Sequence, residues 1–285
     1  MIEKELKAFQ TEEYGKVLNS RQMGRKFFWQ EETDSTNTWA KTYGKKLLEQ
    51  EKSPGPWEEE ADSVLFLAEK QNGGKGRFGR VWNSPPGQNV YMSLLLWKPE
   101  ISPQAAARLT LVMGLSVAQA ASDITQKPVG IKWPNDVVMS GKKICGILTE
   151  MQMEGQKAAF IVIGVGINVN QEAFAPEIQD KATSLLLEKG CEVSREEMAA
   201  RTMEYFEWNY RKLLQTKDLS LLQKDYESLL LNKDRQVRII EKQQETIGIA
   251  RGITETGELL VEDEQGNIRK ILSGEVSVRG LYSYV

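Results

Sequence analysis

The sequence predicts an α+β protein with a central mixed or antiparallel β-sheet, helices on one face of that sheet, and a small C-terminal β-barrel. Between positions 63 and 170, short apolar runs bounded by turn residues recur as they do in the strands of a sheet. Two long segments, 102–124 and 195–214, carry the apolar period of helices. From position 236 onward, short β-branched runs alternate with turns, which is typical of a small antiparallel barrel.

The N-terminal third of the chain alternates helix and strand signals. Residues 3–19 show a loose helical pattern, and residues 26–30 form a short aromatic strand. Asp34-Ser35 then caps a helix whose bulky side chains recur along one face. The apolar runs 63–69 and 90–97 are expected as buried strands.

The middle of the chain continues the sheet and adds long helices. Ser102-Pro103 starts a helix that runs to residue 124, because proline fits the first helical turn. Ser140-Gly141-Lys142 separates two apolar runs and indicates a hairpin. The other expected elements are strands at 130–133, 137–139, 144–151 and 158–170, and helices at 195–214 and 219–231. We place a domain boundary near Asn232, which divides the chain into domains 1–232 and 233–285.

The composition excludes several kinds of catalytic site. The 285 residues include no histidine and only two cysteines. No Ser-His-Asp triad, Cys-His dyad or imidazole zinc site is therefore possible, and two thiols are too few for a thiolate zinc site. Acid–base chemistry would have to come from Asp, Glu, Lys, Tyr or Cys. We expect Cys145, which stands between Ile144 and Gly146, to be a small core residue rather than a nucleophile.

The charge balance and the apolar runs indicate a cytoplasmic protein. The 37 basic and 40 acidic residues give no general case for a nucleic-acid partner. The charged first residues lack a signal-peptide core, and the longest apolar run, 158–169, is too short to span a membrane. We therefore expect no membrane partner, and two reduced cysteines.

A glycine-rich basic loop, residues 71–80, follows the first apolar strand. Its glycines satisfy the G-x-G-x-x-G spacing, but no helix follows to hold a pyrophosphate, so a dinucleotide fold is disfavoured. Lys75, Arg77 and Arg80 supply three cations within six positions. Such a loop can close over an anion, or it can be a solvated basic loop, and both interpretations remain open.

A second motif, Lys132-Trp133-Pro134-Asn135-Asp136, lies between two apolar strands. Proline keeps the preceding residue out of the helical region, so the chain turns at this strand end. Lysine can meet a phosphate there, and aspartate can hold a magnesium ion that also contacts phosphate. The alternative is a capped tight turn with surface charges.

Taken in order, the motifs resemble those of the biotin–protein ligases (biotin–[acetyl-CoA-carboxylase] ligases). The resemblance runs from about Thr33 to the C-terminus. The matching segments are Asp34-Ser-Thr-Asn37, Gly74-Lys-Gly-Arg-Phe-Gly-Arg80, Lys132-Trp-Pro-Asn-Asp136, Lys143-Ile-Cys-Gly-Ile-Leu148, Gly164-Val-Gly-Ile-Asn168, Ala182-Thr-Ser-Leu185 and Ser273-Gly-Glu-Val276. The resemblance implies a class II synthetase-like catalytic domain and an SH3-like C-terminal barrel.

The resemblance also implies a two-step reaction. Biotin and MgATP give biotinyl-5′-AMP and pyrophosphate, and the biotinyl group then passes to a lysine of a biotin carboxyl carrier domain. The implied reagents are biotin, ATP and Mg²⁺, with no tightly bound prosthetic group. By motif position, the implied biotin-binding residues are Ser35, Thr36, Asn37, Gln71, Gly74, Lys75, Gly76, Arg77, Lys143 and Gly146. The implied ATP or adenylate residues are Arg80, Trp82, Lys132, Asn135 and Asn168, the metal ligand is Asp136, and the catalytic cations are Arg77, Lys132 and Lys143.

Two departures from the family pattern shape the expectations. Lys75 stands where the family loop commonly has arginine, so charge is kept but bidentate geometry is lost. About thirty residues precede Asp34, too few for the helix-turn-helix domain of the repressor members, so we expect no DNA binding.

Two rival functions remain, together with an open question about assembly. One rival is a lipoate or octanoyl ligase of related fold, although the polar cluster at 34–37 and Gln71 favour a ureido head group. The other is a non-catalytic sensor or adaptor module. A homodimer is possible.

Overall fold

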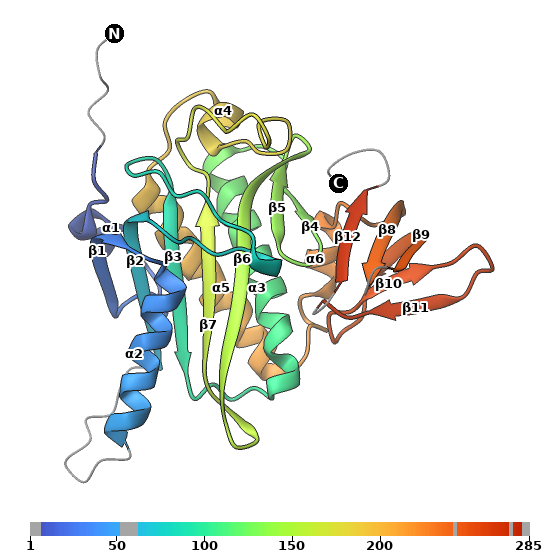
Figure 1. Cartoon of the computed structure of the whole chain (residues 1–285), viewed down its shortest axis with the longest axis horizontal. Coiled ribbons are helices and arrows are strands. Elements are labelled where there is room, and N and C mark those ends of the chain that lie inside the picture. The colour runs from blue at the N-terminus through green and yellow to red at the C-terminus, as the bar shows by residue number, and fades with distance from the viewer. Residues whose placement is uncertain (1–6, 52–61, 242–243, 274–275, 281–285) are drawn as a thin grey trace.

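A seven-stranded mixed sheet forms the centre of the protein (Figure 1). The computed structural model describes residues 7–51, 62–241, 244–273 and 276–280. In spatial order the strands are β1 (Phe27–Thr33), β2 (Ser63–Gln71), β3 (Val90–Trp97), β7 (Lys157–Ile167), β6 (Lys142–Glu154), β5 (Asp136–Met139) and β4 (Gly130–Lys132). The β1–β2 pair is parallel and the other pairs are antiparallel, so the predicted mixed sheet is confirmed.

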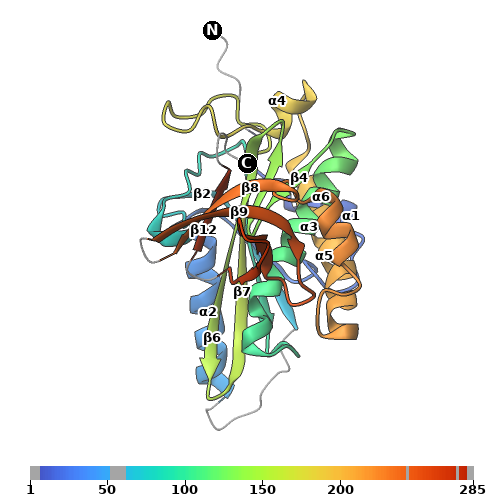
Figure 2. The same ribbon diagram turned by 90° about the vertical axis from the view of Figure 1, so that its right-hand side faces the viewer.

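Helices cover both faces of this sheet, unequally. The sequence predicted helices on one face of the sheet. One face holds α1 (Thr11–Val17), α3 (Ala106–Thr125) and α5 (Arg195–Thr216), whereas α2 (Thr36–Glu51) packs on the opposite face (Figure 2). The cause is strand alternation. In β2, Leu65 and Leu67 join the large core with α3, whereas Phe66 joins a smaller cluster with Trp39 and Tyr43 of α2.

Helix α3 is the central core helix. With the preceding 3-10 turn η2 (Pro103–Ala105) it is long and apolar enough to cross a membrane by length and composition, but 72% of its most apolar window is buried inside the protein. Its contacts with α5 and β6 account for its apolar composition.

Two short helices complete the large unit. Ser184 caps α4 (Leu185–Lys189) by accepting a hydrogen bond from the Leu187 N–H. The sequence predicted one helix over 219–231, but α6 spans only Gln223–Leu229. The Leu219 N–H instead donates to the carbonyl of Glu255 at 2.7 Å, so residue 219 is bonded to the C-terminal unit and not within a helix.

The C-terminal unit is the expected small antiparallel β structure. Its strands β8 (Arg235–Glu241), β9 (Gln244–Ile253), β10 (Leu259–Glu262), β11 (Ile268–Ile271) and β12 (Val276–Gly280) form a sheet in the order β11-β10-β9-β8-β12. Trp133 joins this unit to the large sheet. Its buried indole N–H donates to the carbonyl of Gly257 at 3.1 Å, and its backbone N–H donates to Asn232 Oδ1 at 2.9 Å.

We predict that Glu207→Ala lowers the free energy of unfolding by about 2–3 kcal/mol, because three backbone N–H groups lose their acceptor. Glu207 Oε2 accepts from the N–H groups of Arg21, Gln22 and Met23 within 3.0 Å. Urea unfolding measures the loss, and Glu264→Ala on an exposed turn is the control.

The same substitution should also reduce the pH dependence of stability. Burial raises the pKa of Glu207, but the backbone hydrogen bonds and Arg211 lower it below its ordinary value. A lowered folded-state pKa means that the stabilisation is full above the unfolded value of 4.5 and is lost as pH falls through the folded value. The difference between wild type and variant should therefore shrink at acid pH; a constant difference would contradict this assignment.

Candidate active site

The start of α2 and the end of β2 lie side by side because β1 and β2 are parallel. Thr33 pairs with Gln71 at the strand ends, and the chain enters α2 immediately after β1. Gln71 Oε1 accepts from the Thr36 N–H at 2.9 Å, and Gln71 Nε2 donates to Ser84 Oγ at 2.9 Å. The orientation of the Gln71 amide is therefore fixed by both of its ends.

A buried polar cluster continues from Thr36 into the sheet. Ser93 of β3 is fully buried, and its Oγ lies 2.7 Å from Thr36 Oγ1 and 2.6 Å from Asn37 Oδ1. Asn37 Nδ2 donates to the carbonyl of Leu148 at 3.3 Å and to Glu150 Oε2 at 2.8 Å. Buried polar groups need such partners, because an unpaired one loses its hydration without replacement.

Lys41 and Glu150 close this cluster at its outer end. Lys41 of α2 lies 2.5 Å from Glu150 Oε1, and both side chains are partly exposed. Burial raises the pKa of Glu150, but the hydrogen bonds from Lys41 and Asn37 and the charges of Lys41 and Lys75 outweigh it, so the pKa lies below its ordinary value.

Two facing glycines leave room for an aromatic ring on the sheet. Gly146 of β6 pairs with Gly166 of β7, and a Cβ at either position would lie 2.8 Å or 2.5 Å from the Trp82 ring. The indole therefore rests directly on bare backbone. Its buried Nε1 has no hydrogen-bond partner among the described residues, so this donor is available to a ligand.

The glycine-rich loop forms a small hairpin over this floor. Lys75 bridges to Val81, the Gly76 N–H donates to the carbonyl of Arg80 at 2.7 Å, and η1 (Arg77–Gly79) forms the tip. Lys75 Nζ donates to Thr38 Oγ1 at 2.9 Å, which ties the loop to α2.

Arg77 points from the hairpin into the site and links three parts of the chain. Its Nη1 donates to Asn135 Oδ1 at 3.1 Å, and its Nη2 donates to the carbonyl of Ser273 in the C-terminal unit. Burial lowers the pKa of Arg77, and the nearby charge of Asp136 opposes that shift. The guanidinium stays protonated at neutral pH because its ordinary pKa is so high.

Lys143 and Asp136 form an ion pair beside Trp82. Lys143 Nζ lies 2.5 Å from Asp136 Oδ1 and 5.3 Å from the centre of the indole ring. The described residues contain no group of three or more Asp, Glu, Cys or His side chains placed to hold a metal ion. Magnesium is commonly bound through one or two carboxylates together with phosphate and water oxygens, so a single carboxylate such as that of Asp136 is compatible with the predicted metal role, which stays a prediction.

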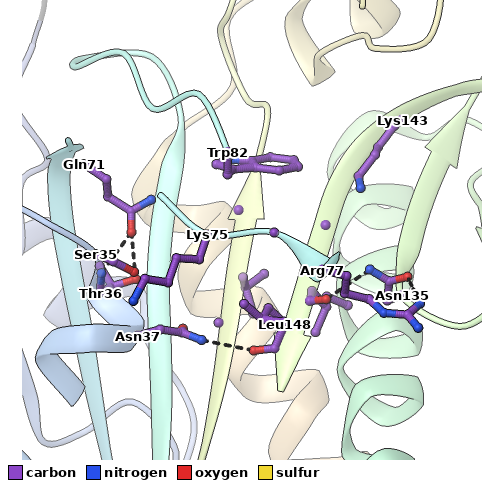
Figure 3. A pocket seen from close by; sticks show the side chains of 16 residues that line it. Ser35, Thr36, Asn37, Gln71, Lys75, Arg77, Trp82, Asn135, Lys143 and Leu148 are labelled. Atoms are coloured by element: carbon purple, nitrogen blue, oxygen red, sulfur yellow. Dashed lines mark hydrogen bonds between the residues drawn. The ribbon is translucent and has the colours of Figure 1, made fainter. Parts of the chain in front are cut away.

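One cavity collects most of the predicted site residues. Figure 3 shows the polar group around Thr36 and Gln71 on one side, Arg77, Asn135 and Lys143 on the other, and Trp82 above the space between them. The cavity is lined by Ser35, Thr36, Asn37, Gln71, Lys75, Gly76, Arg77, Trp82, Asn135, Lys143, Gly146, Ile147, Leu148, Gly164, Val165 and Gly166.

Five predicted residues lie outside this lining. Gly74 supports the loop, since its carbonyl accepts from the Trp82 N–H at 2.9 Å. Arg80 is exposed, and Lys132 is buried opposite Asp136 in the β4–β5 ladder. Asp136 is joined to the lining through Lys143. Asn168 Nδ2 donates to the carbonyl of Thr183 at 3.1 Å, so this amide already has a structural partner. The ligand roles of all five stay predictions.

Cys145 is fully buried, and burial raises the pKa of its thiol. These observations agree with the core position that the sequence predicted.

Sequence reasoning missed several residues that organise the site. Ser93 was detectable, as a lone hydroxyl in the middle of the apolar run that forms β3. Ser84, Lys41 and Glu150 gave no local signal, because each acts through a partner 13 to 109 positions away.

The two units match two family models. Residues 30–168 match the Biotin/lipoate A/B protein ligase family, and residues 234–279 match the Biotin protein ligase C terminal domain.

Among curated proteins, a bifunctional ligase/repressor BirA from Bacillus subtilis is 37% identical over 219 residues, 76% of this chain and 66% of that protein. The chain thus spans just under two thirds of that relative. A biotin–[acetyl-CoA-carboxylase] ligase from Mycobacterium tuberculosis is 32% identical over 221 residues, 75% of this chain and 79% of that protein.

A solved structure extends the likeness to both units. The biotin protein ligase from Aquifex aeolicus in complex with biotin and ATP has a TM-score of 0.74 and 32% sequence identity, and the match covers 90% of this chain and 99% of that one. The shared fold, the two family matches and the identity over most of the Mycobacterium tuberculosis enzyme place the chain in one family. This chain belongs to the biotin protein ligase family.

Proposed function

We propose that this chain is an ATP-dependent biotin–[acetyl-CoA-carboxylase] ligase that makes biotinyl-5′-AMP and passes the biotinyl group to a carrier lysine. The observation that carries the proposal is that a neutral polar cluster and a group of cations line one cavity. Such a cavity suits a ligand with an uncharged hydrogen-bonding head at one end and an anion at the other. We place the reaction in the cytoplasm, where ATP is available.

The polar end of the cavity suits the ureido ring of biotin. That ring offers two N–H donors and one carbonyl, and Ser35, Thr36 and Gln71 supply short polar side chains for them. Ile147 and Leu148 line the middle of the cavity and suit the apolar part of the ligand. A lipoyl group cannot form the corresponding hydrogen bonds with these donors and acceptors, which disfavours the rival lipoate ligase.

The cationic end suits the reacting carboxylate and phosphates. In the first step a carboxylate oxygen of biotin forms a bond to the α-phosphorus of ATP, the bond to the bridging oxygen breaks, and pyrophosphate leaves. No general base is needed, because the carboxylate is already ionised at neutral pH. Arg77, Lys143 and Lys132 then act by stabilising negative charge, and each charge-assisted hydrogen bond contributes about 1.5–3 kcal/mol.

Magnesium would neutralise phosphate charge when it is bound with ATP. Asp136 is the candidate ligand, and the Lys143 ammonium now occupies one of its oxygens. Asn135, the residue before Asp136, accepts a hydrogen bond from Arg77. We expect Arg80 and Trp82 to contact the nucleotide.

In the second step a neutral lysine amine of the carrier domain attacks the acyl carbon, AMP leaves, and the amine proton passes to solvent. We infer solvent deprotonation because the chain has no histidine to act as a base.

We propose that the unit 1–232 carries the chemistry and that 233–285 supports it through Ser273. The described residues before β1 form one seven-residue helix packed on α5, which gives no helix-turn-helix, so we propose that these residues do not bind DNA. A homodimer remains a proposal.

The central test is pyrophosphate release. Biotin added to enzyme, ATP and Mg²⁺ should release pyrophosphate and form an adenylate, whereas lipoate should give less than about a tenth of that rate. Label from biotin should then appear on a carrier domain. Release with lipoate alone would favour the rival ligase, and release with neither would favour a non-catalytic module; either outcome overturns the proposal.

Arg77→Ala should speed loss of the biotinyl-adenylate by about tenfold or more, since two charge-assisted hydrogen bonds that hold the loop are removed. The activated group should then label unrelated lysines. Dissociation of preformed adenylate, followed in stopped flow, measures this effect. Arg201→Ala, at an exposed ion pair on α5, is the control. An unchanged off-rate would argue against a lid role for the loop.

Gly166→Ala should weaken ATP-dependent adenylate formation by at least about tenfold, because the new Cβ would lie 2.5 Å from the Trp82 ring and displace it. The control is Gly15→Ala, where a Cβ meets nothing within 4 Å and a helix gains about 0.5–1 kcal/mol. Quench of tryptophan fluorescence by ligand reports the displacement directly. Normal adenylate formation by Gly166→Ala would show that the Trp82 ring accommodates the added Cβ, and it would contradict this prediction.

A further inference from the structure

A buried ion pair lies beside the segment that follows Trp82. Arg195, the first residue of α5, places its Nη1 2.6 Å from Oε1 of Glu69 in β2, and the two side chains are only 6% and 7% exposed. Loss of hydration makes a buried ion pair costly unless further hydrogen bonds satisfy both charged groups. Neither residue lines the cavity, so the proposed chemistry does not account for the pair.

The pair holds the segment 84–89 from its inner side. Glu69 Oε1 also accepts from the Gly87 N–H at 2.6 Å, and Arg195 Nη1 donates to the carbonyl of Asn89 at 3.3 Å. Gly87 lies in a turn, with a φ of 77° in the left-handed region. This turn lies outside the strands of the sheet, so side-chain contacts must set its position relative to them.

Tyr91 of β3 supports the same segment at another point. Its side chain is almost fully buried, and its hydroxyl donates to the carbonyl of Pro85 at 2.9 Å. The ion pair and this hydroxyl together hold three backbone groups within five residues. An irregular segment with few other contacts depends on such buried hydrogen bonds for a single conformation.

Residues 7–9 cover the other side of the ion pair. Glu69 Oε2 accepts from the Phe9 N–H at 2.7 Å, and Arg195 Nη2 donates to the carbonyl of Lys7 at 2.5 Å. The Phe9 side chain is buried, and its ring centre lies 5.9 Å from the guanidinium carbon. The pair is therefore shielded from water, which strengthens its hydrogen bonds to the segment 84–89.

The front of the segment reaches the cavity. Ser84 Oγ accepts from Gln71 Nε2 at 2.9 Å and donates to the carbonyl of Trp82 at 3.1 Å. Gln71 lies at the polar end of the cavity, and the Trp82 ring lies above the space between the two ends (Figure 3). A displaced segment would therefore shift both side chains at once, through Ser84.

We propose that Glu69, Arg195 and Tyr91 are positioning residues for adenylate formation, because the segment they hold sets the places of Ser84 and Trp82. The inference rests on the proposed function and adds to it three residues outside the cavity. Adenylate formation must align two bound reactants, and a misplacement of about 1 Å that originates far from the chemistry can slow such a step by about a hundredfold.

Glu69→Ala removes the acceptor of the Gly87 N–H, and Glu207→Ala is a closely matched control. The two glutamate side chains are each 7% exposed, and each pairs with an arginine of α5. Each also accepts backbone N–H groups of an irregular segment, but the segment held by Glu207, residues 21–23, does not line the cavity. We expect both substitutions to destabilise the protein and only Glu69→Ala to slow the reaction of the folded enzyme.

The measurement combines stability and single-turnover rate. Urea unfolding gives the folded fraction of each full-length variant, and quenched flow at saturating biotin and ATP gives the rate of adenylate formation per folded molecule. We expect a loss of about tenfold or more for Glu69→Ala and of less than about twofold for Glu207→Ala. An equal loss in both variants, or no loss in Glu69→Ala, overturns the inference.

Tyr91→Phe tests the same support without leaving a buried charge unpaired, so it decides the matter if Glu69→Ala does not fold. Tyr14→Phe is its control, since the buried Tyr14 hydroxyl also donates to a loop carbonyl, that of Gly24 at 3.1 Å, away from the cavity. We expect Tyr91→Phe to lower the rate per folded molecule by about threefold or more and Tyr14→Phe to leave it unchanged. Equal rates in these two variants overturn the inference. If wild type forms no adenylate, the proposed function itself falls.

Discussion

The site depends on the absence of side chains from one stretch of the central sheet. Gly146, Gly164 and Gly166 lie on the adjacent strands β6 and β7, and a Cβ at Gly164 would come within 2.0 Å of Asn37 Oδ1. Protein interiors are otherwise close-packed, so bare backbone is the means by which a sheet face admits other groups. The Trp82 ring fills part of this space and Asn37 another part. The polar cluster, the loop and the cavity all take their positions from it.

The cations are placed by tertiary contacts rather than by a basic surface. The chain is acidic overall, with a net charge of −3, yet Lys75, Arg77 and Lys143 line one cavity. Lys143 is paired with Asp136, and Arg77 is held by two neutral oxygens. An arriving anion therefore meets charges whose geometry is already set, which reduces the reorganisation needed for charge stabilisation. The absence of histidine fits a reaction that needs such cations more than a proton carrier.

The sequence predicted those parts that have local causes. Strand β3 begins and ends at the predicted residues, since its apolar run is continuous, and the motif residues converge on one cavity because each lies at a strand end or a loop. Long-range contacts were not predictable. Glu150 orients Asn37 from 113 positions away, α2 covers the second face through an aromatic cluster, and α6 starts late where Leu219 bonds to the C-terminal unit. No periodicity in a single segment encodes such partners.

The two units and the loop are held together by contacts of very different strength. Trp133 is buried, and both its indole and its backbone N–H have partners, so the C-terminal unit is fixed to the large sheet by core contacts. The loop hairpin is held by Arg77 and Lys75, while Phe78 and Val81 at its tip remain 56% and 80% exposed. Segments with few buried apolar contacts open at low free-energy cost. The loop hairpin is therefore held less firmly than the C-terminal unit, to which it is joined by the hydrogen bond from Arg77 to the carbonyl of Ser273.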